Sequence, residues 1–129
     1  MDDANPLLVL ARQVASRAYV PYSRFRVGAA VRDARGALHV GCNVENASYG
    51  LTLCAERNAI FGAISAGAVR PFEALAVACV DAEPGGCSPC GACRQVIAEH
   101  LRVDAPVFVD GLGRFTIAEL LPHGFTLAR

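Results

Sequence analysis

Two separated cysteine motifs constrain this chain more than any other feature, because they must meet in space if they hold one metal ion. Cys54-Ala55-Glu56 places a thiol two residues before a carboxyl group, and the later segment Pro89-Cys90-Gly91-Ala92-Cys93 has a Cys-x2-Cys spacing common in zinc sites. Three protein ligands, Cys54, Cys90 and Cys93, leave the fourth position of a tetrahedral zinc open for water, which is typical of catalytic sites. Glu56 is then the candidate acid–base group beside that position.

Cys87 is a possible fourth ligand of the metal ion. With Cys90 and Cys93 it forms Cys-x2-Cys-x2-Cys, which also occurs in iron–sulfur proteins, and with Cys54 it would complete a closed four-thiolate zinc site. Pro89 marks the start of a helix, which predicts that Cys87 lies outside the helix and faces away from the other sulfurs. We therefore expect three metal ligands, with the four-thiolate arrangements as the alternative.

The remaining cysteines are predicted to be free thiols. Cys42 and Cys79 fall on apolar strand patterns, where a thiol packs as a small core side chain. The six cysteines could instead form three disulfides, as in small secreted domains. Helix and strand patterns already account for most of the chain, however, and the acidic start Met1-Asp2-Asp3 does not resemble a secretory signal. These observations favour free thiols and a cytoplasmic protein.

Composition restricts the partners. The chain has a formal net charge of zero and no block of basic residues, so the positive surface that nucleic-acid binding needs is not expected. No apolar run is long enough to span a membrane. Hydrophobic residues make up 53% of the chain, which indicates either an oligomer interface or simply the many alanines. The length of 129 residues suits a single catalytic domain over residues 1–129.

Hydrophobic periodicity predicts alternating helices and strands. Asn5-Pro6 opens a first helix that ends near Tyr19, and residues 24–31 and 38–44 alternate around a turn at 33–36, as in a β-hairpin. The later segments are predicted to be a helix from Thr52 to Gly67, a strand at 74–80, a helix from Ser88 to Leu101, strands at 105–109 and 115–117, and a short helix at 117–121. This order predicts an α/β fold, a three-layer α/β/α arrangement with a mixed sheet of about five strands.

Both cysteine motifs fall at predicted helix starts. With Thr52 as the N-cap of one helix and Ser88 as the N-cap of the other, Cys54 and Cys90 lie in first turns. The free backbone N–H groups and the positive dipole ends of both helices would then point at one metal and favour thiolates. Arg57 is predicted to donate to a cysteine sulfur and to offset part of the negative charge of three thiolates on Zn²⁺.

The chain resembles the cytidine deaminases of the small, homotetrameric, three-cysteine type, within the cytidine and deoxycytidylate deaminase superfamily. A Cys-x-Glu motif followed by Pro-Cys-x2-Cys resembles the known signature of zinc-dependent nucleobase deaminases. The match covers nearly the whole length. Its segments are residues 22–30 (YSRFRVGAA), 41–52 (GCNVENASYGLT), 54–57 (CAER), 88–95 (SPCGACRQ) and 120–125 (LLPHGF).

The resemblance implies a cytidine deaminase-like fold and the hydrolytic deamination of cytidine and deoxycytidine to uridine and deoxyuridine, with release of ammonia, in pyrimidine salvage. It implies one Zn²⁺ per subunit on Cys54, Cys90 and Cys93, with Glu56 as the proton shuttle. It further implies a tetramer with shared active sites. The implied substrate contacts are Phe25 along the pyrimidine, Asn43 and Glu45 at the ribose, Ala55 at the base edge, and Tyr49 and Phe125 reaching a neighbouring subunit's site.

Two positions depart from the family pattern and affect the detail of the substrate pocket. Arg26 stands where a small or apolar residue is usual, and Gly124 where a bulkier one is common. A deaminase of a related nucleoside or nucleoside antibiotic is the nearest alternative, and the neutral charge disfavours a polynucleotide substrate. A non-catalytic, zinc-stabilised module is the alternative from another class. Glu56 argues against such a module, which has no need of an acid beside its metal.

Overall fold

A computed structural model describes residues 5–83 and 86–128, so the acidic start at residues 1–3 lies outside the described residues. The elements are, in chain order, α1 (Pro6–Val14), the 3-10 helix η2 (Ala15–Arg17), β1 (Val27–Arg32), β2 (Leu38–Cys42), the 3-10 helix η3 (Tyr49–Leu51), α2 (Ala55–Ser65), β3 (Ala74–Cys79), α3 (Gly91–His100), β4 (Val107–Val109), β5 (Gly113–Phe115) and α4 (Ile117–Leu120). None of the described helices has the length and apolar character that a membrane span requires.

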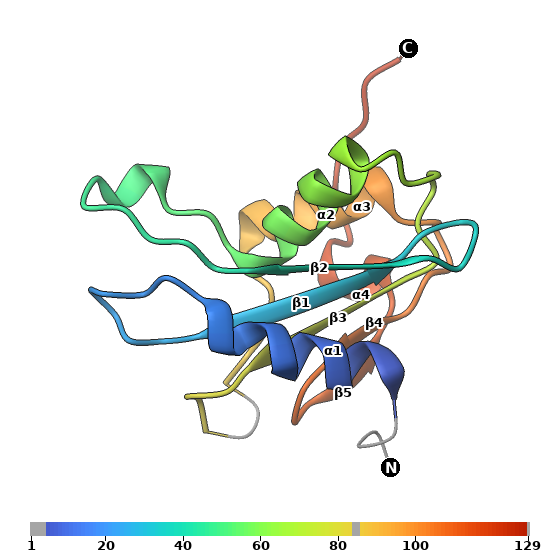
Figure 1. Ribbon diagram of the computed structural model, residues 1–129. Coiled ribbons are helices and arrows are strands. Elements are labelled where there is room, and N and C mark those ends of the chain that lie inside the picture. The colour runs from blue at the N-terminus through green and yellow to red at the C-terminus, as the bar shows by residue number, and fades with distance from the viewer. Residues whose placement is uncertain (1–4, 84–85, 129) are drawn as a thin grey trace.

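The strands of the described chain form one mixed sheet in the order β2-β1-β3-β4-β5. β3 and β4 are parallel, and the other neighbouring pairs are antiparallel. Figure 1 shows α2 and α3 side by side on one face of the sheet and α1 on the opposite face. The predicted three-layer α/β/α fold with a mixed sheet of five strands is thereby confirmed.

The two faces of the sheet are packed with different side chains. The core under α2 and α3 contains the large buried residues, among them Ile60, Phe72, Leu75, Val77, Ile97, Val107 and Val109. The α1 face is filled mainly by the alanines of the strands, with Leu7, Leu8 and Ala11 of the helix packed against them. Larger side chains bury more apolar area, so most of the hydrophobic stabilisation comes from the α2/α3 face.

Two glycines let helices approach the β1–β2 hairpin closely. A methyl group at Gly28 would collide with the backbone of α1 at Ala11, and one at Gly41 would collide with the backbone of α2 at Ala59. Backbone atoms cannot swing aside as a flexible side chain can, so neither position has room for a Cβ atom. The contact at Gly41 seats α2, whose first residues enter the site described below.

The predicted caps of α2 and α3 were each wrong by two residues. Cys54 is the N-cap of α2 and Cys90 is the N-cap of α3. Thr52 is not the cap because α2 begins only at Ala55, and the Thr52 hydroxyl accepts the N–H of Asn46 at 3.2 Å rather than one of the first turn of the helix. Cys90 replaces the predicted cap Ser88, because its own sulfur accepts the N–H of residue 93 at 3.4 Å, as a serine oxygen would.

The last strand was also placed two residues too late. β5 ends at Phe115, because Thr116 caps α4. The Thr116 hydroxyl accepts the N–H of Glu119 at 3.1 Å, and the Glu119 carboxylate accepts the N–H of Thr116 at 2.8 Å. This reciprocal capping box begins the helix where the strand had been expected to end. The Asn5 cap of α1 is confirmed, since its side chain accepts two N–H groups of the first turn.

Candidate functional site

Three cysteine sulfurs meet where the N-termini of α2 and α3 come together. The sulfurs of Cys54, Cys90 and Cys93 all lie within 4.8 Å of one another, and those of Cys54 and Cys90 are 3.8 Å apart. Cys93 is fully buried in the first turn of α3, whereas Cys90 is exposed. Both helices present free backbone N–H groups and a positive dipole end on this side, which stabilises thiolates.

The sulfur cluster fits a tetrahedral zinc ion with three protein ligands. Zn–S bonds of about 2.3 Å place two sulfurs of a tetrahedron about 3.8 Å apart, which matches the Cys54–Cys90 distance. Cys87, the possible fourth ligand, cannot bind the metal ion because it forms a disulfide with Cys79. The four-thiolate and iron–sulfur alternatives therefore fail. In the described part of the chain, the cluster offers three sulfurs and one open position.

Arg57 contacts the cluster from the first turn of α2. Its Nη2 donates to the Cys54 sulfur at 3.5 Å, as the sequence predicted. Hydrogen bonding with Cys93, and then with Arg57, outweighs burial and lowers the pKa of the Cys54 thiol to about 5. The same bond with Cys54, together with burial, raises the pKa of Cys93. A divalent cation on the three sulfurs would displace the remaining protons, because thiolates are the ligand form.

Glu56 brings a carboxyl group to the edge of the cluster. Its side chain is only 4% exposed, in the first turn of α2. Burial, and then the negative charge of Cys54, raises the pKa of Glu56 to about 7, with Arg57 opposing the shift. A cation held by the sulfurs would favour the charged form and lower this pKa. A carboxyl group with a pKa near neutrality both accepts and donates a proton readily, which is what acid–base catalysis requires.

A pocket of about 220 Å³ opens directly onto these groups. Six residues singled out from the sequence line it together, namely Phe25, Asn43, Cys54, Ala55, Glu56 and Cys90. Cys93 lies behind this wall, since it is buried and is not part of the lining. The remaining lining residues are Val27, Thr52, Val77, Cys79, Gly86, Cys87 and Ser88. The pocket thus joins an apolar side, a carboxyl group and the sulfur cluster in one cavity.

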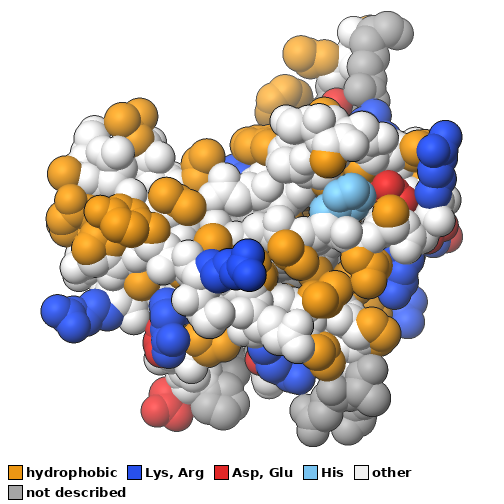
Figure 2. Space-filling view, in the orientation of Figure 1, with side chains coloured by type: hydrophobic (Ala, Val, Ile, Leu, Met, Phe, Trp, Pro, Cys, Tyr) orange, Lys and Arg blue, Asp and Glu red, His pale blue; other side chains and the backbone are white. Residues whose placement is uncertain are grey.

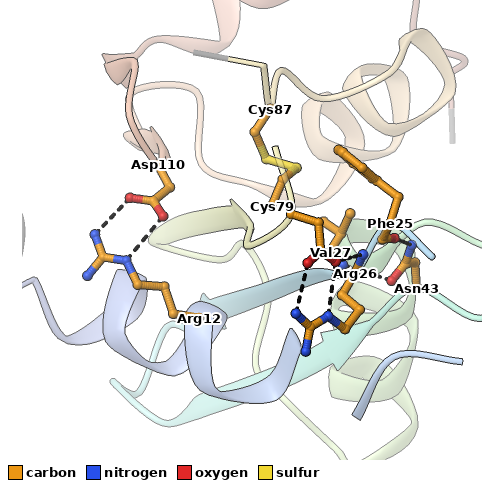
Figure 3. Close-up of a disulfide and its surroundings, with 9 residues drawn as sticks. Arg12, Phe25, Arg26, Val27, Asn43, Cys79, Cys87 and Asp110 are labelled. Carbon is orange, nitrogen blue, oxygen red and sulfur yellow. Dashed lines mark hydrogen bonds and ion pairs between the residues drawn. A yellow bond between two sulfur atoms is a disulfide. The ribbon is translucent and has the colours of Figure 1, made fainter. Parts of the chain in front are cut away.

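Asn43 fixes the aromatic side of the pocket. Its Oδ1 accepts the N–H of Val27 at 2.9 Å, and its Nδ2 donates to the carbonyl oxygen of Phe25 at 2.8 Å, as Figure 3 shows. These two bonds hold the backbone on both sides of residue 26. A carboxamide carries two N–H donors, so the Asn43 side chain keeps one donor for a ligand.

Glu45 lies outside this lining, in an adjoining hollow. That hollow measures about 340 Å³ and is lined by Tyr22, Ser23, Glu45, Tyr49 and Thr52; Thr52 also lines the first pocket. The Glu45 carboxylate accepts the backbone N–H groups of Tyr22 and Ser23, each at 3.1 Å, and the Ser23 hydroxyl. The Ser23 hydroxyl, against a smaller effect of burial, lowers the pKa of Glu45, so this group is ionised near neutral pH.

Tyr49 and Phe125 do not join the pocket that contains Glu56. Tyr49 is 77% exposed on η3, and Phe125 is 67% exposed beyond α4, where its carbonyl oxygen accepts a hydrogen bond from Gln95 at 3.0 Å. Figure 2 shows hydrophobic side chains gathered at the end of the molecule where the segment between β2 and α2 projects in Figure 1. The large exposed hydrophobic residues of that segment are Val44, Tyr49 and Leu51.

The disulfide in the pocket wall was not predicted from the sequence. Cys79 and Cys87 were expected to be a free core thiol and a thiol facing away from the site, but they are bonded and both line the pocket. The Cys-x7-Cys spacing was the only signal, and it does not by itself distinguish a disulfide from two free thiols. Whether two cysteines can bond depends on their separation in space.

The hydrogen-bonding role of Arg94 is a second feature that the sequence did not predict. Its guanidinium group donates to the carbonyl oxygen of Pro89 at 2.8 Å, to that of Leu120 at 2.9 Å and to the Ser88 hydroxyl at 2.6 Å. It therefore connects the first turn of α3 to the segment before Cys90 and to the end of α4. No local sequence pattern predicts these hydrogen bonds of Arg94, because its partners lie up to 26 residues away in the chain.

Comparison with known proteins places these features in a family. Residues 1–109 match the family model described as the cytidine and deoxycytidylate deaminase zinc-binding region. The chain is 48% identical to a cytidine deaminase of Sporosarcina psychrophila, over 96% of this chain and 92% of that protein. It is 49% identical to a cytidine deaminase of Mycobacterium tuberculosis, over 97% of this chain and 91% of the relative.

Solved structures give the same result for the fold. A cytidine deaminase from Burkholderia pseudomallei superposes with a TM-score of 0.83 at 44% identity, covering 92% of this chain and 96% of the other. The Mycobacterium tuberculosis enzyme superposes with a TM-score of 0.82 at 42% identity, covering 97% and 98%. The matched zinc-binding region contains Cys54, Cys90 and Cys93, the three sulfurs that converge in this structure.

Proposed function

The chain belongs to the cytidine deaminase family, and on this premise we propose that it hydrolyses cytidine and deoxycytidine at the exocyclic amino group, releasing ammonia and leaving uridine or deoxyuridine. The observation that carries the proposal is the position of Glu56, a buried carboxyl group in the wall of a pocket that is also lined by Cys54 and Cys90, two of the three cysteines of the metal-binding cluster. Burying a carboxyl group costs stability unless it is compensated. A zinc-stabilised binding module would have no reason to bear that cost.

The cofactor is zinc, held by Cys54, Cys90 and Cys93. When bound, it supplies a Lewis acid that makes water nucleophilic at neutral pH. Arg57 offsets part of the negative charge of the three thiolates through its contact with the Cys54 sulfur. Without that compensation the metal would be a weaker Lewis acid, so we assign Arg57 a tuning role.

Glu56 is the proton shuttle in this proposal. It accepts a proton from the attacking water and delivers it to ring N3 of the cytosine, which makes C4 more electrophilic. It then removes the proton from the new hydroxyl group on C4 and passes it to the amino nitrogen, which leaves as ammonia while C4 becomes the carbonyl carbon of the product. Its burial supports this role, because a desolvated carboxyl group holds its proton more tightly than an exposed one and so donates at a higher pH.

The substrate contacts follow the lining of the pocket. Phe25 packs along the pyrimidine ring, and the backbone of Ala55 contacts the base edge beside Glu56. The second side-chain N–H of Asn43 and the carboxylate of Glu45 bind the ribose hydroxyl groups. The two residues line neighbouring cavities that share Thr52, so one ribose can contact both. An ionised carboxylate at that end repels a phosphate, which favours a nucleoside over a nucleotide.

A homotetramer with shared active sites is the quaternary structure that we propose. Tyr49 and Phe125 are both exposed and both lie outside the pocket that contains Glu56, although Tyr49 lines the adjoining hollow; exposure of this kind is expected of residues that reach a neighbouring subunit's site. The exposed apolar residues Val44 and Leu51 flank Tyr49, and such clusters often mark interfaces. Sedimentation equilibrium of the purified chain tests this, and a monomer at assay concentration would exclude shared sites.

Two expectations about the whole chain remain predictions. We propose that residues 1–129 form one catalytic domain, because the site draws on β1, the residue after β2, α2, β3 and the start of α3 together. We also retain the prediction that the protein acts in the cytoplasm. Limited proteolysis tests the first, since a single domain yields no stable fragment, and fractionation of cells that express the chain tests the second.

A substrate panel tests the proposed reaction. Zinc-loaded protein is mixed in turn with cytidine, deoxycytidine, cytidine monophosphate and a cytosine-containing single-stranded DNA, and ammonia release is measured. We expect both nucleosides to react, with kcat/KM for the monophosphate and the polymer lower by about 100-fold or more. Preferential turnover of either charged substrate would overturn the nucleoside assignment, and absence of turnover with all four would overturn the reaction.

A further inference from the structure

The Cys79–Cys87 disulfide has no part in the mechanism above, although both of its residues line the substrate pocket. It joins the last residue of β3 to the irregular segment 86–90, which leads into the N-cap Cys90. The two cysteines are eight residues apart in the sequence, so the bond closes a short loop. It therefore cross-links the sheet to the part of the chain that delivers a zinc ligand.

The sheet end of this cross-link is held firmly without it. Cys79 pairs with Val27 in the β1–β3 register. Two residues further on, Asp81 accepts the Nε of Arg26 at 3.0 Å, its Nη2 at 2.8 Å and its backbone N–H at 2.8 Å. Arg26, the unusual residue at this position, thus anchors the chain just after β3. Cys79 is a fixed point from which the disulfide holds Cys87.

The other end of the cross-link depends on fewer contacts. Cys87 belongs to no helix or strand, and the residues after it, Ser88 and Pro89, are held by the side chain of Arg94. The segment just before Cys90 is therefore held at two points, covalently at Cys87 by the disulfide and through hydrogen bonds at Ser88 and Pro89 by Arg94. Breaking the covalent tie increases the conformational freedom of residues 86–89, three of which line the pocket.

A second cleft borders the disulfide on the side opposite the substrate pocket, where Cys79 is half-buried and Cys87 is 4% exposed. A cleft of about 350 Å³ on that side is lined by Arg12, Cys79, Val80, Ala82, Glu83, Cys87, Asp110 and Gly111. Figure 3 shows the disulfide between the Arg12–Asp110 ion pair on one side and Phe25 with Asn43 on the other. The two cysteines therefore form a partition between the substrate pocket and an outer cleft large enough for a small thiol.

We propose that Cys79 and Cys87 are positioning residues for the deamination: their disulfide fixes the pocket wall opposite Phe25, and its reduction by a low-molecular-weight dithiol weakens nucleoside binding. This inference rests on the proposed function. In the reduction the Cys79–Cys87 S–S bond breaks, each sulfur gains a proton, and the two thiols of the reductant give up their protons and become one disulfide. Oxidised glutathione reverses the reaction, forming two molecules of reduced glutathione.

Alkylation first tests whether the bond forms. Zinc-loaded protein treated with oxidised glutathione is denatured, stripped of zinc and alkylated with iodoacetamide, and its intact mass is measured. Because four of the six cysteines are free in the structure, we expect four alkyl groups before reduction with dithiothreitol and six after it. Six alkyl groups before reduction would overturn the inference without bearing on the reaction itself.

Kinetics then test what the bond does. For the Cys79→Ser/Cys87→Ser double variant with cytidine, we expect KM to rise about 3- to 10-fold while kcat changes less than about 2-fold, because ground-state and transition-state binding weaken together. Zinc content, measured by atomic absorption, should stay at one per chain. An unchanged KM, or loss of kcat together with zinc, would overturn the positioning role.

Controls separate this inference from the proposed function. Cys42→Ser removes a free thiol of β2 outside the pocket and should respond to oxidised and reduced glutathione as the wild-type chain does. If the double variant does not fold, the wild-type chain measured before and after reduction provides the same comparison, and its KM should rise and return on reoxidation. A wild-type chain that deaminates cytidine with the same KM in both states refutes the inference and leaves the function standing.

Discussion

The start of α2 and the start of α3 form the site in different ways. Each helix begins at a cysteine N-cap whose sulfur joins the cluster. The first turn of α2 adds the buried acid Glu56, whereas the first turn of α3 adds a second sulfur, Cys93, and the bracing side chain of Arg94. Proton transfer is thus assigned to one helix and most of the metal binding to the other, so mutations at the two helix starts should have separable effects.

Cys93→Ser should have the largest effect on zinc binding and activity, because it removes the buried sulfur ligand in the first turn of α3. Losing a hydrogen bond to a metal ligand costs roughly 10- to 100-fold in metal affinity, and losing the ligand itself should cost more than about 100-fold. We expect zinc content, ammonia release and melting temperature all to fall. Normal zinc content after extensive dialysis would show that α3 does not dominate metal binding.

Glu56→Gln should have the next largest effect and should be confined to turnover. The amide keeps the shape of the carboxyl group but cannot shuttle a proton, so kcat should fall by about 10³-fold. Zinc content and melting temperature should stay at the wild-type values. If zinc is lost as well, the two helix starts are not separable and the comparison between them fails.

Arg94→Ala should weaken the metal-binding helix without touching the chemistry. The variant loses three hydrogen bonds from a half-buried guanidinium group, which should lower the free energy of unfolding by about 1–3 kcal/mol. Denaturant titration measures this. Arg102→Ala is the matched control, because its contacts with Asp104 and Glu73 are exposed and should contribute less than about 1 kcal/mol. Equal effects of the two changes would argue against a bracing role.

Arg57→Gln should have the smallest effect of these changes, and it tests whether α2 also contributes to metal binding through Arg57. Removing the charge beside the Cys54 sulfur should lower zinc affinity by about 10-fold, with a fall in kcat well below that of Glu56→Gln. Competition with a chromogenic chelator measures the affinity. Arg57→Lys keeps the charge and should recover part of the loss. If both the affinity and the kcat of Arg57→Gln equal those of the wild-type chain, Arg57 has no part in the site.

The sequence predicted the large features of this fold because they depend on local patterns. Alternating apolar residues placed the β1–β2 hairpin, and Asn5 with Pro6 placed the start of α1. The N-caps of α2 and α3 were missed because Thr52 and Ser88 are ordinary capping residues that bond elsewhere here. Cysteine is an uncommon cap, and only the metal-binding cluster explains why it occupies this position twice.

The site was predicted in part for a related reason. The zinc ligands and Glu56 belong to short motifs, so their chemistry can be recognised from spacing. The partner of Cys79 could not be found in this way, since it depends on how the chain after β3 returns to the sheet. The separation of Glu45 from the pocket containing Glu56 likewise depends on hydrogen bonds to residues more than 20 positions earlier.

The missing side chains at Gly28 and Gly41 limit how this scaffold can be altered. Neither residue touches the pocket, yet each would drive a methyl group into the main chain of a helix. A saturation library scored for folding should therefore return almost only glycine at both positions. An engineer who wishes to reshape the substrate pocket should vary its walls and treat these two positions as fixed, because any replacement would shift a whole helix and carry the catalytic acid or its supporting layer with it.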